Sequence, residues 1–70
     1  MSKVMTNMAG NVWKVLVKPG DQVSAGEDVV ILESMKMEIP IQAETDGTVK
    51  ELQVNEGDFV NEGDVLVEFE

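Results

Sequence analysis

The chain has 70 residues, of which 43% are apolar, and it contains neither cysteine nor histidine. This length allows one small core, and the missing residue types exclude a disulfide framework, thiolate and imidazole metal sites, and the usual catalytic nucleophiles and bases. Five lysines against 14 acidic residues give a net charge of −9, which disfavours nucleic acid and anionic membrane surfaces as partners.

Apolar residues occur in short runs along the whole chain, and glycine-containing segments separate these runs. In chain order, the predicted strands cover residues 1–8, 11–17, 22–24, 28–33, 38–45, 48–54, 59–60 and 65–70. No segment of about 10 to 12 residues has the spacing and caps of a helix. Eight short strands with Gly and Asp turns are typical of an antiparallel sandwich or a small barrel.

Four glycines invite a comparison with phosphate-binding loops, namely Gly20, Gly26, Gly57 and Gly63. Each precedes Asp or Glu, no Lys-Ser or Lys-Thr follows, and no helix is predicted to receive a phosphate. We therefore predict that they form turns, where glycine tolerates a positive φ. The acidic residues lack the spacing of an EF-hand and predict a solvated surface rather than a calcium site. The single tryptophan, Trp13, is interpreted as a packing residue rather than a ligand platform.

An internal repeat organises the chain. With an offset of 37 residues and no gaps, residues 1–33 pair with residues 38–70, and only 34–37 have no counterpart. The positions that recur unchanged in the second copy are Gly10, Val12, Val17, Gly20, Asp21, Val23, Gly26, Val30 and Glu33. Solenoids need about three or more copies. Two copies predict instead one closed domain over residues 1–70 with a pseudo-two-fold axis.

This symmetry has a geometric consequence for the unmatched junction. The axis maps the joint between the two copies onto the two chain ends, so Lys36 is expected at one end of the domain and both termini at the other. A competing interpretation makes residues 34–41 one continuous strand, with Lys36 as an ordinary exposed lysine. Neither Gly nor Pro marks a turn in this segment, and sequence rules alone leave both interpretations open.

The junction also carries a motif. Glu33-Ser34-Met35-Lys36-Met37 resembles the biotin attachment motif of the biotinyl/lipoyl domain family, usually Glu-Ala-Met-Lys-Met, with Ser34 where alanine is common. The glycine hairpin at 19–26 and its echo at 56–63 resemble the same family, so the resemblance covers the whole chain. It implies an all-β fold, a flattened barrel or sandwich of two four-stranded antiparallel sheets with quasi-two-fold symmetry and Lys36 on an exposed hairpin.

The resemblance implies a non-catalytic carrier rather than an enzyme. A biotin protein ligase would attach biotin to Lys36 as an amide, and this swinging arm would carry carboxylate from a biotin carboxylase to a carboxyltransferase acting on an acyl-CoA or a 2-oxo acid. The resemblance also favours partner recognition by residues beside the lysine, namely Glu33, Ser34, Met35, Met37 and Glu38. From the residues alone, the two methionines fit core packing equally well, and the two glutamates fit plain solvation.

Two other functions remain open. A lipoyl carrier of a 2-oxo acid dehydrogenase or glycine cleavage system has the same fold, but typically Asp-Lys-Ala at the lysine, and dual modification with lipoate is compatible with similar hairpins. The fold also occurs as an unmodified structural module. No apolar run approaches the roughly 18 residues of a membrane span, and no signal peptide is evident, so we expect a cytoplasmic protein. We also expect the domain to be monomeric and, because it starts at Met and closes both copies of the repeat, self-sufficient.

Overall fold

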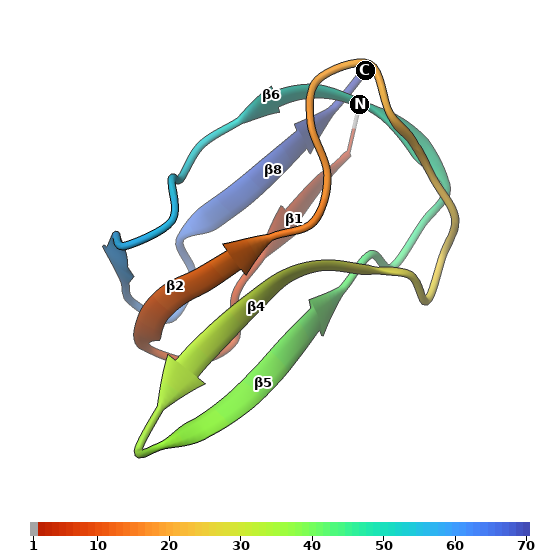
Figure 1. Cartoon of the computed structure of the whole chain (residues 1–70). Coiled ribbons are helices and arrows are strands. Elements are labelled where there is room, and N and C mark those ends of the chain that lie inside the picture. Colours follow the sequence, from red (N-terminus) through yellow and green to blue (C-terminus); the bar gives the residue numbers. More distant parts are fainter. Residues whose placement is uncertain (1) are drawn as a thin grey trace.

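The computed structural model describes residues 2–70, which form eight strands joined by turns (Figure 1). The strands are β1 Lys3–Met5, β2 Gly10–Val15, β3 Gln22–Val23, β4 Asp28–Ser34, β5 Met37–Gln42, β6 Gly47–Leu52, β7 Phe59–Val60 and β8 Val65–Phe69. Each corresponds to one predicted strand. The first differs most, because only Lys3–Met5 of the predicted residues 1–8 form a strand. Met1 lies outside the described residues.

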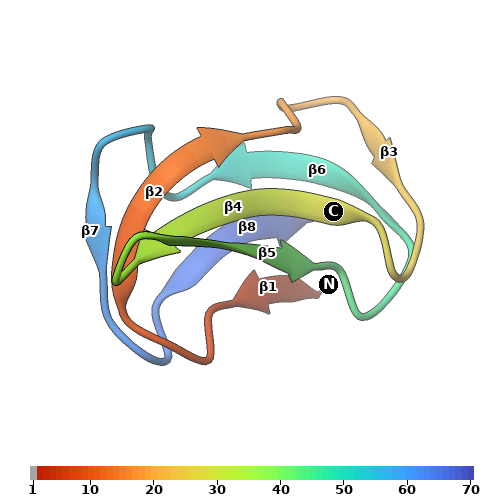
Figure 2. The same ribbon diagram turned by 60° about the horizontal axis from the view of Figure 1, so that its bottom comes forward.

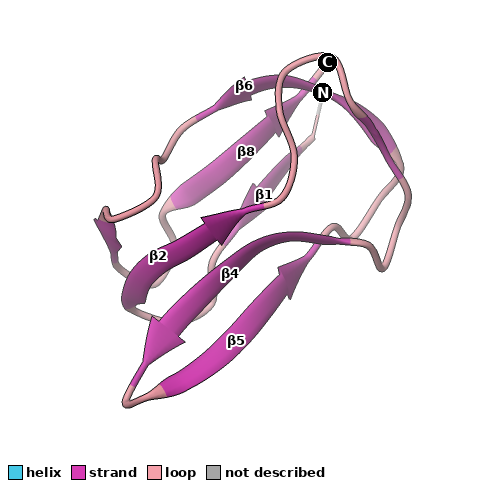
Figure 3. Cartoon of the chain, in the orientation of Figure 1, coloured by secondary structure: helices cyan, strands magenta, loops and turns pink. Residues whose placement is uncertain are grey.

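The strands form two antiparallel sheets of four, in the orders β1-β8-β6-β3 and β5-β4-β2-β7. Figure 3 shows strands and loops only, and residues 2–70 include no helix that could cross a membrane. Shifting every strand by one copy of the repeat converts one sheet order into the other, strand for strand. The predicted all-β fold of two four-stranded antiparallel sheets is confirmed.

Hydrogen bonds recur with the same 37-residue offset and join each copy to the other. The Gly20 N–H donates to the Val49 carbonyl, and the Gly57 N–H donates to the Val12 carbonyl, both at 2.8 Å. Each glycine turn of one copy is therefore fastened to a strand of the other copy. Neither copy completes its backbone pairing alone, so the two copies form one body around a shared core.

The glycine turns have the geometry that the sequence predicts. Gly20 and Gly57 have φ values of 96° and 97°, in the left-handed region that glycine enters at little cost. The following aspartates close the turns, because Asp21 Oδ2 accepts from the Lys18 N–H at 3.0 Å and Asp58 Oδ2 accepts from the Asn55 N–H at 2.8 Å. These carboxylates thus have a structural role within the turns.

The core lies between the sheets and is built mainly from valine. Its largest fully buried side chains are Phe69, Leu32, Leu66, Val12, Val29, Val30, Val49 and Val67. The phenyl ring of Phe69 lies directly over Gly47, where a Cβ atom would stand 2.9 Å from two ring carbons. The repeat-equivalent Gly10 is crowded as well, since a Cβ there would stand 3.0 Å from the Glu33 carbonyl oxygen.

We expect Gly47→Ala to destabilise the domain by about 1–3 kcal/mol, because the new methyl group overpacks the Phe69 ring. Urea denaturation followed by circular dichroism measures the change. Thr48→Ala, one position along the same strand, is the matched control and should change the free energy of unfolding much less. Equal denaturation midpoints for Gly47→Ala and the parent would show that the ring moves aside freely.

The chain ends and the junction between the copies lie at opposite ends of the molecule (Figure 1). The Phe69 N–H donates to the Ser2 carbonyl at 2.8 Å, which holds the two terminal segments side by side. The turn between β4 and β5 lies at the other end, and Figure 2 views the molecule with this turn brought forward. The longest dimension of the domain is 32 Å, against 19 and 18 Å for the other two. The geometry expected from the repeat is therefore found.

Candidate functional site

The unmatched junction forms a two-residue hairpin turn. Strands β4 and β5 pair up to Ser34 opposite Met37, and only Met35 and Lys36 lie between them. Both have positive φ, 53° and 64°, the signature of a type I′ turn. The interpretation of residues 34–41 as one continuous strand is therefore wrong, because the chain reverses direction at Met35 and Lys36.

This turn is formed without the residues that favour it. Type I′ turns usually contain Asn-Gly or Asp-Gly, whereas a side chain in the left-handed region costs about 1–2 kcal/mol per residue. The cost is offset by the strands behind the turn, whose inward side chains Val30, Leu32 and Ile41 are buried. Strained backbone held by its surroundings is common at functional sites. Here the two strained residues form the turn itself, so Lys36 lies at the tip of the hairpin.

The side chains beside the lysine lie outside the core. Met35 is 90% exposed and Met37 is 58% exposed, so neither contributes to core packing, one of the two roles that the sequence left open. Ser34 is half-buried at the end of β4. A methionine as exposed as Met35 gains nothing from core packing, and its unbranched, polarizable side chain suits contact with another molecule.

Glu33 and Glu38 are directly opposite each other on β4 and β5, and both are exposed. Like charges in this cross-strand position repel each other and destabilise the pair. The hairpin thus carries two adjacent negative charges immediately before the turn that presents Lys36. A partner with basic side chains would relieve this repulsion on binding.

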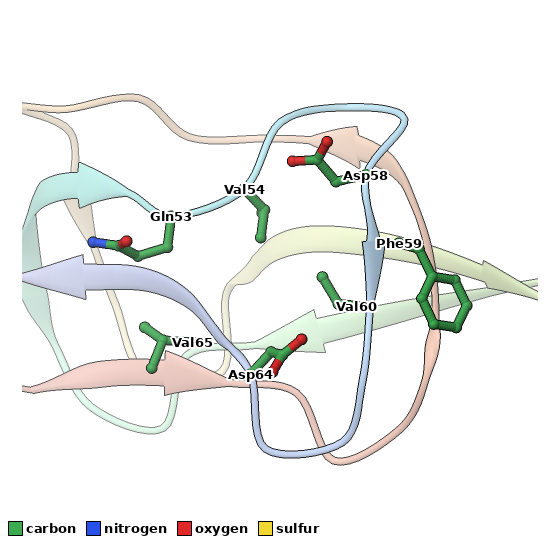
Figure 4. A pocket seen from close by; sticks show the side chains of 7 residues that line it. All are labelled: Gln53, Val54, Asp58, Phe59, Val60, Asp64 and Val65. Atoms are coloured by element: carbon green, nitrogen blue, oxygen red, sulfur yellow. The ribbon is translucent and has the colours of Figure 1, made fainter.

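Lys36 does not line the main depressions in the surface of the domain, although a smaller one includes Ile39 and Pro40 of its own hairpin. One depression of about 450 Å³ opens beside β7 and is lined by Gln53, Val54, Asp58, Phe59, Val60, Asp64 and Val65 (Figure 4). None of these residues belongs to the β4–β5 hairpin. Within residues 2–70, no group of three or more potential acidic ligands could hold a metal ion. An exposed primary amine at a protruding turn suits amide formation in the active site of another protein.

Comparison with known proteins decides the family. The family model described as "Biotin-requiring enzyme", for biotin and lipoyl domains, matches residues 1–69. The chain belongs to this biotin/lipoyl attachment family. The family consists of carrier domains, so the attachment domain described here is a carrier domain by descent.

Among curated proteins, the biotin/lipoyl attachment protein of Bacillus subtilis strain 168 is 66% identical over 65 residues, covering 93% of this chain and 89% of that protein. The pyruvate carboxylase of Staphylococcus aureus is 44% identical over 69 residues, covering 99% of this chain. The attachment domain spans only 6% of that carboxylase. It is therefore homologous to a small part of a much larger enzyme.

Solved structures show the same backbone. The Kluyveromyces lactis urea carboxylase matches with a TM-score of 0.87 and 33% identity, over 94% of this chain and 6% of that one. The lipoyl domain of the 2-oxoglutarate dehydrogenase complex of Azotobacter vinelandii matches with a TM-score of 0.72 and 35% identity, over 89% of this chain and 78% of that one. The attachment fold is thus shared with a carboxylase and with a lipoyl domain.

Sequence reasoning missed two features of the attachment domain. The left-handed pair at Met35 and Lys36 has no glycine signal, and only the gap in the repeat pointed to it. The exposure of Phe59, which is 62%, was also missed, and Trp13, interpreted as a core or surface-packing residue, is 41% exposed. Comparing the two copies position by position is the signal that finds these two aromatic residues, because their counterparts Gln22 and Lys50 are polar.

Proposed function

We propose that this protein is a biotin carrier in which Lys36 receives biotin from a biotin protein ligase. The observation that carries the proposal is the placement of Lys36, between two exposed methionines, at the tip of a strained hairpin turn. The sequence Met35-Lys36-Met37 resembles the biotin form of the family motif rather than the lipoyl form. The carboxylase relative, at 44% identity, supports the same choice.

Attachment needs an amide bond between the carboxyl carbon of biotin and Lys36 Nζ. The lysine must lose a proton before it attacks, and the sequence offers no histidine to accept this proton. The ligase therefore supplies both the activated acyl donor and the base. The role of this chain is to present Lys36 beyond the rest of its surface, so that the amine reaches an enclosed active site.

Once attached, biotin would supply a group that accepts carboxylate at one active site and releases it at another. We propose that a biotin carboxylase and a carboxyltransferase are the two partners, because homologous segments lie within carboxylases. The contribution of the domain is mechanical: a rigid body holds a mobile arm. Tethering replaces free diffusion of the cofactor by a high effective concentration near both active sites.

The deciding experiment is an intact mass of the protein purified from its native cells, followed by peptide mapping around Lys36. One biotinyl amide on Lys36 is the expected result. A lipoyl amide would favour the second candidate function, a lipoyl carrier, for which the similarity to the Azotobacter vinelandii lipoyl domain is the supporting observation. An unmodified Lys36 would contradict both and would favour a structural module.

We expect Met35→Asp combined with Met37→Ala to shift loading from biotin toward lipoate, because this creates the Asp-Lys-Ala sequence typical of lipoyl carriers. Aspartate tolerates the left-handed conformation, so the turn should be kept. Mass spectrometry after incubation with both ligases measures the ratio of the two groups. Met5→Ala, which alters another exposed methionine on a strand outside the hairpin, is the control. Unchanged biotin loading in the double variant would show that the methionines do not select the cofactor.

A further inference from the structure

The two sheets have the same backbone but different outer surfaces. At four repeat-equivalent positions, the sheet β5-β4-β2-β7 carries an apolar residue where the sheet β1-β8-β6-β3 carries a polar one. The pairs are Trp13 with Lys50, Ile31 with Glu68, Pro40 with Lys3, and Phe59 with Gln22. We call Trp13, Ile31, Pro40 and Phe59 the apolar face.

The members of each pair occupy equivalent places. Ile31 pairs across the sheet with Pro40, as Glu68 does with Lys3, and each of the four has the same burial class as its counterpart. Phe59 likewise lies opposite Asn11, as Gln22 lies opposite Thr48. The polar residues of the sheet β1-β8-β6-β3 show that this backbone needs no apolar side chain at these positions. The apolar face therefore has no explanation in folding.

The side chains of this face point away from the core. Val30 and Leu32 are fully buried, so the alternation of β4 turns Ile31 outward. Figure 4 shows Phe59 and Val60 on opposite sides of β7, with the ring of Phe59 on the side away from Val54 and Val65. The exposed methionine of the other sheet, Met5, lies on the edge strand β1, where it lines a shallow depression together with Pro40.

The apolar face is continuous with the attachment hairpin. One row across the sheet runs from Phe59 through Asn11 and Glu33 to Glu38, and the next pair, Ser34 with Met37, borders the turn. Figures 1 and 2 show β2, β4 and β5 side by side, leading to the turn. A protein that covers this face would lie beside the point from which the Lys36 arm extends.

Charge identifies the kind of occupant. Glu33 and Glu38 border the apolar face, and the whole chain carries −9. A second copy of the chain would bring these charges together, which opposes self-association. The one lysine that pairs within this face, Lys14, places its Nζ 5.5 Å from the centre of the Trp13 ring. A different protein with an apolar recess bordered by Lys and Arg fits the surface.

We propose that the apolar face is the docking surface for the biotin carboxylase, whose active site the Lys36 arm must enter. This inference rests on the proposed biotin carrier function. Exposed Trp and Phe are typical anchors of protein interfaces, because they bury a large area at little entropic cost. Docking through the face would position the body of the carrier while leaving the hairpin free to enter the enzyme.

The test exchanges the face for its polar counterpart. Trp13→Lys with Phe59→Gln gives the sheet β5-β4-β2-β7 the residues that the sheet β1-β8-β6-β3 has at the equivalent positions, and Gln22→Ala with Lys50→Ala alters those positions on the other sheet as a control. We expect the first variant, biotinylated on Lys36, to raise the KM of the biotin carboxylase for the carrier by about tenfold with kcat unchanged. The control should leave KM unchanged, and both should melt near the parent temperature. An unchanged KM, or slower loading by the ligase instead, would overturn the proposal.

A second measurement needs no biotin and no substitution of a residue in the apolar face. Lys36→Arg protein labelled with fluorotryptophan reports on Trp13 alone, because the chain has a single tryptophan. Titration with the biotin carboxylase should shift this one resonance, and no shift would overturn the docking proposal. Self-association on concentrating the carrier alone would overturn the choice of occupant. The intact mass of native protein tests the biotin assignment separately, so failure of that assignment is distinguishable from failure of docking.

Discussion

Lys36→Arg is expected to abolish cofactor loading completely while the domain stays folded. Arginine keeps the positive charge and the length of the side chain, but its guanidinium does not lose a proton under protein conditions and forms no stable amide with the acyl donor. Because Lys36 lies at an exposed turn, the substitution removes no core contact. Intact mass after incubation with the ligase measures loading.

The matched control is Lys50→Arg, which makes the same chemical change on a strand of the other sheet. This variant should be loaded like the parent protein. Four lysines besides Lys36 remain available in the Lys36→Arg protein, so a ligase that only required an exposed amine would still modify it. Loading of the Lys36→Arg variant at any lysine would contradict the assignment of Lys36.

Phe69→Ala is expected to lower the free energy of unfolding by about 3–5 kcal/mol, because a fully buried aromatic ring is replaced by a cavity. A domain of 70 residues has a total stability on the order of 4–10 kcal/mol. This single change therefore removes a large share of the stability, and the variant should be partly unfolded near its physiological temperature. Urea or thermal denaturation followed by circular dichroism measures the loss.

The chain has its own control, because it has two phenylalanines in opposite environments. Phe69 is 2% exposed and Phe59 is 62% exposed. Phe59→Ala should change the free energy of unfolding by no more than about 0.5 kcal/mol. Equal losses for the two variants would show that the packing between the sheets does not dominate stability. A docking role for Phe59 predicts the opposite ranking in assays with the biotin carboxylase.

The hairpin turn between β4 and β5 departs from the usual residue preference of turns with positive φ. In the rest of residues 2–70, turns that need a positive φ contain glycine, as at Gly20 and Gly57. At the hairpin, Met35 and Lys36 take the same conformation without it. A glycine at the tip would relieve the strain but would remove either the amine that we propose as the acceptor or an exposed methionine. Agreement among local signals is therefore broken at the proposed attachment site.

The sequence by itself determined the strands and the glycine turns. Its repeat also predicted the lysine at the end opposite the termini, although local rules left a continuous strand at the junction open. The strands and turns follow from local patterns, because alternation sets which residues face a core and Gly-Asp pairs form turns wherever they occur. The gapless repeat added the symmetry, since two copies of one pattern with a short joint have few ways to close. The resemblance of residues 33–37 to the biotin attachment motif then predicted that Lys36, in this joint, carries the cofactor.

Only the tertiary structure decided how the two copies share their hydrogen bonds, which conformation the junction takes and what the outer faces display. The turn at Met35 and Lys36 depends on the pairing of β4 with β5, and that pairing is held by a core to which both copies contribute. The exposure of Trp13 and Phe59 likewise depends on which side of each strand the opposite sheet covers. Burial on a pleated strand is set by its neighbours in space, and a single sequence does not state which neighbours those are.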